Sequence, residues 1–439
     1  MQTSEEKELI EHIRLRPGMY LGTLGNGKSI KDGIYRLFQE ILNFSIDEFR
    51  QGYGNEIEVM IEDNQTISIY DSGTGLSFDE RTWNGKPFLK VSGITVDEVL
   101  VINMAKALCS HLEISFHKNG VASYHRYKNG ILIEETEKET EFEDGTSIRF
   151  TPDETVFNCF EYVEDIVLQK LRNVTYLNEG LDIIFNGTRM RATDGMGELL
   201  ADKKPHKSYY LYPIIHFKNE ALDIAITHSR LEYENCYSFV NGLYTNLGGT
   251  HLSSLKEVVS SVILELYPSD GFIPKDVYAG LVGAISINME RPMFNSVNRW
   301  RLETVYLSED KSCTIKEFIH DFFYAKFKEY LLEHKDVCDI ILERITTAKK
   351  HRIFAEKCLS MSINQLVDLW NNGIETGKLS SMELYAIRDA FLSKKVQTIE
   401  MQRSNAIVKR LKIGYDKVFN IIHCSGRFFS ETSGVLLQF

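Results

Sequence analysis

The stretch Glu40-Ile-Leu-Asn-Phe-Ser-Ile-Asp-Glu48 lies in a segment where apolar residues recur every three or four positions. This spacing predicts an amphipathic helix over residues 30–52. Immediately afterwards the period changes to two, and residues 56–61 and 66–70 predict the two short strands of an antiparallel hairpin. Further along, the pattern predicts a helix at 96–109 and strands at 112–117, 122–127, 130–135 and 146–151. Helices on one side of a mixed sheet indicate an α+β fold.

A second block of alternating residues begins near residue 208. Here the pattern predicts strands at Tyr209–Phe217, Leu222–Thr227 and Gly280–Met289, a helix at 252–267, and long helices from 314 to about 360. We therefore expect three parts, namely a first domain at 1–205, a second domain at 206–355 and a C-terminal region of unknown role at 356–439.

Composition restricts the class of protein. The 439 residues are 43% hydrophobic and 26% charged, which is typical of a soluble globular chain. No apolar stretch reaches the length of a membrane span, and the polar segment Met1–Lys7 does not resemble a signal peptide. The seven cysteines lie far apart and form no CxxC pair, which favours reduced thiols and a cytoplasmic location.

The charge is unevenly distributed. The net charge of −12 argues against a surface covered with basic residues for nucleic acid. Residues 391–439, however, carry eight basic and three acidic side chains. This basic tail offers a contact for the phosphate backbone of DNA, while a solvated helix face is the alternative interpretation.

The segment from Gly22 to Ser29 matches the P-loop pattern GxxxxGK followed by Ser or Thr. A P-loop lies between a buried strand and a helix, where its backbone amides surround phosphates. Pro17 and Gly18 interrupt the preceding segment, so that segment does not fit a central strand. The strands that follow predict a hairpin rather than parallel crossovers, so the P-loop interpretation is disfavoured.

Several elements, in this order, resemble type IIA topoisomerase B subunits of the gyrase B and topoisomerase IV kind. Arg16–Gly22 resembles the family's RPGMYIG, Glu40–Glu48 its EVVDNSIDE helix, and Tyr70–Leu76 its DxGxG turn. The other matching elements are Gly145-Thr146, Val174–Gly180 and Ser238–Leu252. The resemblance implies a GHKL (Bergerat) α/β sandwich, then a transducer domain of ribosomal-S5-like fold, and a mostly helical C-terminal region.

The resemblance also implies a site for ATP with magnesium. It suggests Glu40 as the general base and Arg299 as the contact to the terminal phosphate, in place of the lysine of the family's QTK element. It suggests Asp71, Gly73, Gly75 and Thr146 on the adenine side, where Asp71 accepts a hydrogen bond from the exocyclic amine. The glycines let the backbone approach a flat ligand. The alternatives are a surface carboxylate for Glu40 and an ordinary hairpin exit for Asp71–Gly75.

The phosphate side of this site departs from the family pattern. Phe44 stands where the family's magnesium-binding asparagine is expected, and a phenyl ring offers no oxygen ligand. Asn43 could bind metal or nucleotide only after a local rearrangement, because one helical residue is a rotation of about 100°. The lid region 92–103 keeps a single glycine, Gly93, and brings Asp97 and Glu98 towards the phosphates. Val297 replaces the glutamine of the QTK element.

These features predict a dimerising ATP-gate module in which hydrolysis is weak or lost, with a structural or regulatory role in DNA topology. No EGDSA or DxDxD segment is present, so we expect no Toprim domain in this sequence. Two alternatives stay open. One is an active ATP-dependent gate that works with a separate cleavage subunit. The other is a nucleotide-independent module that binds DNA or protein.

Overall fold

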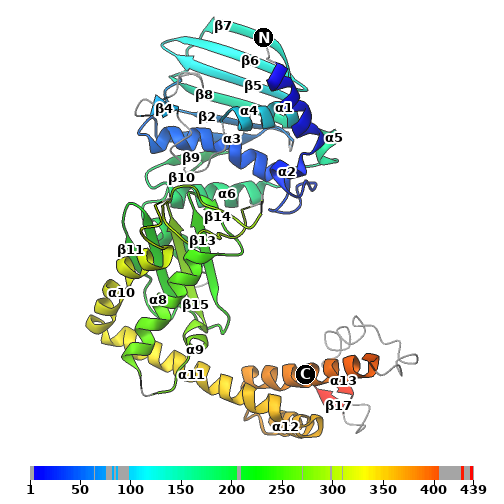
Figure 1. Ribbon diagram of the computed structural model, residues 1–439, viewed down its shortest axis with the longest axis vertical. Helices are drawn as coiled ribbons and strands as arrows, with labels where there is room; N and C mark the ends of the chain where they lie inside the picture. Colours follow the sequence, from blue (N-terminus) through cyan, green and yellow to red (C-terminus); the bar gives the residue numbers. More distant parts are fainter. Residues whose placement is uncertain are drawn as a thin grey trace. The chain divides into compact units, whose positions relative to one another are not determined.

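A computed structural model shows the chain as an α+β protein with a helical C-terminal part (Figure 1), as the sequence predicts. It describes residues 4–63, 65–75, 82–83, 86–87, 98–204, 209–268, 270–296, 299–308, 310–404, 427–429 and 436–438. The chain divides into two compact units, one of residues 1–262 with 280–333 and one of residues 263–279 with 334–439. Within the described ranges no helix is long and apolar enough to cross a membrane.

The first unit contains an eight-stranded mixed sheet with strand order β10-β9-β1-β2-β8-β5-β6-β7. The predicted hairpin is confirmed, since β1 pairs with β2 in antiparallel register, while β1 and β9 run parallel. The strands are β1 Glu56–Ile61, β2 Ile67–Asp71, β5 Cys109–Lys118, β6 Val121–Lys128, β7 Ile131–Glu139, β8 Gly145–Pro152, β9 Asp182–Phe185 and β10 Thr188–Met190. A separate short ladder joins β3 Thr82–Trp83 to β4 Lys86–Pro87.

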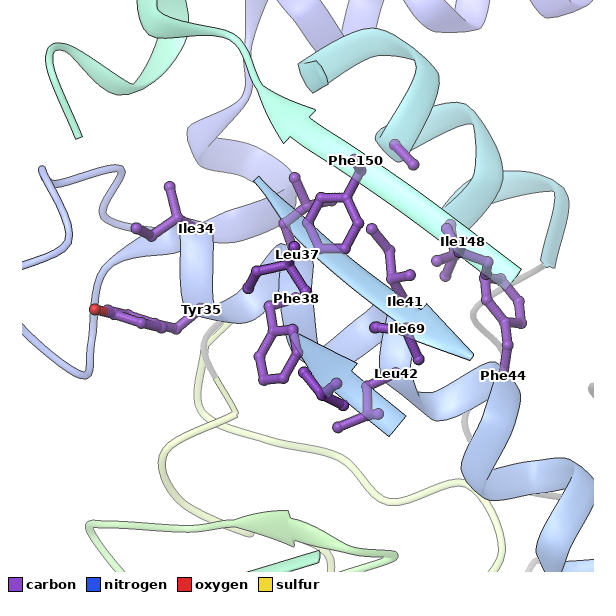
Figure 2. Packing of buried hydrophobic residues seen from close by; sticks show 14 of the residues in the cluster. Ile34, Tyr35, Leu37, Phe38, Ile41, Leu42, Phe44, Ile69, Ile148 and Phe150 are labelled. Carbon is purple, nitrogen blue, oxygen red and sulfur yellow. The ribbon is translucent and has the colours of Figure 1, made fainter. Parts of the chain in front are cut away.

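The helices of this part are α1 Ser4–Leu15, α2 Gly18–Leu21, α3 Gly33–Arg50, α4 Glu98–Leu108, α5 Glu154–Phe157 and α6 Glu164–Leu177. Helix α1 contacts α4, and α2 contacts α3. Helix α3 contacts β1, β2 and β8, α4 contacts β5 and β8, and α6 contacts β9. Figure 2 shows the apolar row of α3, including Leu37 and Ile41, against Ile69 and Phe150 of the sheet. Each such burial contributes about 1.5–3 kcal/mol, and the row also fixes which face of α3 remains for the site.

A five-stranded sheet with order β11-β12-β15-β13-β14 completes the first unit. The strands are β11 Ile215–Lys218, β12 Leu222–His228, β13 Asn235–Val240, β14 Leu243–Tyr244 and β15 Leu281–Ile287. The helices of this part are α7 Gly195–Asp202, α10 Ile315–Glu333 and α8 Thr250–Leu266, whose residues after 262 belong to the second unit. The predicted strand Tyr209–Phe217 is wrong over residues 209–214. Pro213 lacks the backbone N–H that a ladder requires, so regular pairing begins only at Ile215.

The second unit is mainly helical. It contains α9 Pro274–Tyr278, α11 Lys335–Ser360, α12 Ile363–Thr376, α13 Ser381–Ser404 and the antiparallel pair β16 Arg427–Phe429 and β17 Leu436–Gln438. Ser362 caps α12 in a capping box with Gln365, and Gly377 ends the helix in the left-handed conformation. Leu366 and Trp370 face the buried cluster of this unit. Most of the basic tail predicted to contact DNA lies outside the described residues.

Candidate nucleotide site

The loop that matches the P-loop pattern has a different structure from a P-loop. It follows helix α2 rather than a strand. The side chain of Asp32 accepts hydrogen bonds from the amides of Gly27 and Ser29, at 2.9 and 3.1 Å. These amides therefore stabilise the loop itself, and Gly27 has a φ of +90°, which suits glycine. This agrees with the prediction that the match is not a phosphate-binding loop.

Asp71 lies at the end of β2 and is only 2% exposed. Its Oδ1 accepts hydrogen bonds from the amides of Gly73 at 3.0 Å and Thr146 at 3.2 Å. Its Oδ2 accepts one from the hydroxyl of Ser45 on α3 at 2.7 Å. Thr146 is its direct partner in the β2–β8 ladder. The fold thus brings Asp71, Gly73 and Thr146 together, with Ser45 as a partner that the sequence analysis missed.

The turn after Asp71 requires its glycines. Gly75 has a φ of +63°, and a Cβ there would lie 1.7 Å from the carbonyl oxygen of His117. A Cβ on Gly73 would lie 2.6 Å from Oε2 of Glu48, which also accepts a hydrogen bond from the amide of Thr74 at 2.7 Å. Glu48 is 1% exposed, so α3 holds this turn through a buried carboxylate that sequence reasoning did not single out.

Glu40 lies on α3 and is 5% exposed, so the surface alternative for this carboxylate is wrong. The Arg36 side chain donates from Nε to Oε1 of Glu40 at 2.7 Å. Nη1 of Arg299 lies 3.5 Å from the same oxygen. The two residues that the resemblance assigns to the phosphate side therefore meet. The helical i, i+4 spacing of Arg36 and Glu40 was a signal in the sequence, and the sequence analysis did not use it.

The electrostatics keep Glu40 ionised. Burial raises the pKa of Glu40, but the charges of Arg36 and Arg299, the hydrogen bond from Arg36 and the charge of Lys170 together outweigh it. The pKa of Glu40 is therefore lowered from its ordinary value. Burial also lowers the pKa of Arg299 to about 10, against the attraction of Glu40. Burial and the charge of Arg36 lower the pKa of Lys170 on α6 to about 8.

Phe44 and Asn43 lie one helical turn beyond Glu40 and Gln39. Phe44 is 2% exposed and belongs to the hydrophobic core, at the Ile148 end of the cluster in Figure 2. Oδ1 of Asn43 accepts a hydrogen bond from Nε2 of Gln39 at 3.2 Å. Asn43 therefore lies on the same face of α3 as Gln39, and not on the face of Glu40. Neither arrangement supplies magnesium with oxygen ligands beside Glu40. Across the described ranges, no three His, Cys, Asp or Glu side chains are grouped to hold a metal ion.

A cavity opens beside Glu40. It is lined by Met19, Tyr20, Arg36, Glu40, Leu100, Met104, Phe294, Ser296 and Arg299. Of the predicted lid and QTK residues, Gly93, Asp97 and Val297 lie outside the described residues, and the same holds for the Glu98 side chain. The described residues thus provide a buried carboxylate at Asp71 with three hydrogen-bond donors and a buried carboxylate at Glu40 beside two arginines. The side chain at position 44 offers no oxygen ligand.

Comparisons with known proteins agree with the fold described above. The family model described as DNA gyrase B matches residues 192–358. The chain is 31% identical to the B subunit of DNA topoisomerase 4 from Borreliella burgdorferi, over 82% of this chain and 61% of that protein. It is 27% identical to the B subunit of DNA gyrase from Streptococcus pyogenes, over 80% of this chain and 58% of that protein. The chain thus spans about three fifths of the length of these relatives.

Two solved structures share the fold. One is the 43K ATPase domain of Thermus thermophilus gyrase B in complex with an aminocoumarin, with TM-score 0.59 and 22% identity, covering 79% of this chain and 96% of that one. The other is the topoisomerase IV ATP-binding domain of Francisella tularensis, with TM-score 0.59 and 19% identity, covering 78% and 98%. Together with the sequence relatives, they identify this chain as having a GHKL-type N-terminal region like that of type IIA topoisomerase B subunits.

Proposed function

We propose that this chain is a dimerising ATP-gate module of the type IIA topoisomerase B-subunit kind in which ATP hydrolysis is weak or lost. The observation that carries the proposal is the position of Glu40, buried between Arg36 at 2.7 Å and Arg299 at 3.5 Å. The module would then serve as a structural or regulatory partner in DNA topology rather than as an efficient ATPase.

Glu40 is a poor general base in this arrangement. A general base must accept a proton from the attacking water, and its efficiency falls as its pKa moves below the working pH. The two guanidinium groups stabilise the carboxylate and lower the pKa of Glu40. Protonating Glu40 would also leave two half-buried arginines without their counter-charge, which opposes the transfer.

The residue at position 44 also supports weak or lost hydrolysis, because it provides no ligand for magnesium. ATP is bound with magnesium, which demands near-octahedral oxygen ligands. The buried ring of Phe44 provides none, and Asn43 is engaged by Gln39. The adenine side, with Asp71 and Thr146, keeps groups that suit a purine amine. We therefore expect ADP and ATP to bind with similar, poor affinity, since the terminal phosphate gains few contacts.

Steady-state phosphate release by the purified chain tests the proposal, with Glu40→Ala as the matched control. We expect release at the background rate in both proteins, with and without magnesium. A nucleotide titration should give similar dissociation constants for ADP and ATP. Robust release that Glu40→Ala abolishes would refute the proposal and establish the active ATP-dependent gate instead. Absence of any nucleotide binding would favour the nucleotide-independent module.

The partners belong to the same proposal. The two relatives are named as subunits of DNA topoisomerase 4 and DNA gyrase. By analogy we propose a homodimer, a separately encoded cleavage subunit and a cytoplasmic location. Direct contact with DNA would use the basic tail, most of which lies outside the described residues.

A further inference from the structure

We propose that a second pocket of the first unit binds phosphate, either as the free ion or as the phosphate group of a small monoester. This pocket lies beside the N-terminal end of α3, next to α6 and to the β13–β14 turn. Its polar lining includes Lys31, Arg36, Lys170, Asn246 and Arg299. It is not the cavity beside Glu40, because Lys31, Lys170 and Asn246 line only the second pocket, while Arg36 and Arg299 border both.

The charge of the lining favours an anion. Lys31, Arg36, Lys170 and Arg299 bring four positive charges to one pocket. Asp32 is the acidic residue of the described lining, and its Oδ2 already accepts hydrogen bonds from two backbone amides. Asp32 and Glu40, which pairs with Arg36 and Arg299, offset part of this charge. The excess of cations that remains favours an anion in this partly buried site.

Two buried polar atoms of the lining make no hydrogen bond, namely Oδ1 of Asn246 and Nη1 of Arg299, whose contact with Glu40 at 3.5 Å is an ion pair. A buried polar atom without a hydrogen bond carries a free-energy penalty that a ligand can remove. Nη1 of Arg299 is a charged donor and suits an anionic oxygen, whereas Oδ1 of Asn246 is an acceptor and requires a donor. The ligand should therefore offer both negative charge and a hydroxyl group.

Phosphate meets both requirements, and sulfate meets only one. Around neutral pH a phosphate group retains a proton for part of the time, because its relevant pKa lies near 6 to 7. Its P–OH can donate to Oδ1 of Asn246 while its other oxygens accept from Lys170 and the arginines. Sulfate carries no proton at this pH. The lowered pKa of Lys170, about 8, agrees with a buried ammonium group that a bound anion would stabilise.

An aromatic ring and an ion-paired arginine form part of the wall of this pocket. The ring of Trp300 forms part of the wall, and Lys31 Nζ lies 5.1 Å from its centroid. The side chain of Arg36 is held at Glu40 by the 2.7 Å hydrogen bond. An anion in the second pocket would share Arg36 and Arg299 with Glu40, but it would need neither adenine nor magnesium.

Calorimetric titration of the full chain with inorganic phosphate, glycerol 3-phosphate and sulfate tests the inference. We expect saturable binding of inorganic phosphate, of the monoester or of both, and binding of sulfate at least tenfold weaker. Lys170→Gln should weaken phosphate binding about tenfold or more, since it removes a charge-assisted contact. Lys128→Gln removes the same charge from an exposed position of β6 and should bind phosphate like the parent chain.

Asn246→Asp is a second, nearly isosteric variant. It places a negative charge at the orphan acceptor and should abolish phosphate binding, even if Lys170→Gln proves unstable. Thermal unfolding of each variant verifies that it is folded, and an ADP titration shows that the nucleotide site is unchanged. The inference is overturned if the folded parent chain binds no phosphate, if sulfate binds equally well, or if both variants retain parental affinity. The inference is also overturned if ADP displaces phosphate and Lys170→Gln leaves phosphate affinity unchanged, because phosphate would then occupy the nucleotide site.

Discussion

Replacing Phe44 with asparagine would restore the residue type that the family resemblance expects at the magnesium position. The structure predicts that this change destabilises the chain instead of repairing the site. Phe44 is 2% exposed and lies in the core cluster with Ile148. Its removal therefore leaves a cavity in a close-packed region, where the neighbours relax only partly.

Two contributions determine how much unfolding free energy Phe44→Asn loses. Truncating a buried phenylalanine costs about 3–5 kcal/mol of unfolding free energy, and the asparagine recovers part of that volume. A buried amide without a hydrogen-bond partner costs about 1–3 kcal/mol more. We therefore expect a loss of about 4 kcal/mol, which is a large fraction of the stability of an ordinary domain, about 5–15 kcal/mol.

Urea unfolding followed by circular dichroism measures this loss, and phosphate release measures the activity. Phe38→Asn is the matched control, because Phe38 is a fully buried phenylalanine on the same helix and in the same cluster. We expect similar losses for the two variants and no gain in phosphate release for Phe44→Asn. A loss below about 1 kcal/mol for Phe44→Asn, with the full loss for Phe38→Asn, would refute the reasoning. It would mean that position 44 can turn a polar side chain towards solvent or a metal.

The remaining predictions concern domains, assembly and pH. Limited proteolysis should cut first within the charged, proline-containing segment 202–208, and resistance there would contradict separate domains at 1–205 and 206–355. Light scattering should detect a twofold dimer, and only monomer with and without nucleotide would count against a gate. Asp223 and Asp194 raise the pKa of His216, so its contribution to stability should be full at low pH and fall as pH rises through that pKa. His216→Asn should lack this pH dependence, whereas exposed His111→Asn should keep it.

Much of the fold could be predicted from local pattern. The change from a period near 3.6 to a period of two located α3 and the β1–β2 hairpin, because side-chain direction follows backbone geometry directly. The predicted strand from Tyr209 failed over residues 209–214 because the prediction gave more weight to the apolar pattern than to Pro213, whose missing N–H prevents ladder pairing.

Some residues of the candidate site could be predicted from the sequence, and others could not. Asp71, Gly73, Gly75 and Thr146 could be named from their motifs. Asp71, Gly73 and Gly75 share one short turn, whereas Thr146 joins them through the pairing of β2 with β8. Ser45 and Glu48, which bind Asp71 and the turn, were missed, because their roles depend on how α3 is rotated over the sheet. Their polar side chains within an apolar helix pattern were the available signal.

The sequence by itself determined the α+β class, the order of the motifs and the presence of phenylalanine at position 44. These are properties of residue identity and spacing along the chain. Only the tertiary structure decided that Glu40 meets Arg36 and Arg299, and that Lys170, Asn246 and Arg299 share one pocket. Arg36 and Glu40 are neighbours on one helix, but Lys170, Asn246 and Arg299 lie far from them in sequence. The distances, burial and charge that these residues share depend on how α3, α6 and the second sheet pack within the first unit. Interactions between charges that are distant in sequence leave no periodic pattern in the sequence. They can therefore be identified only from the packed positions of the side chains.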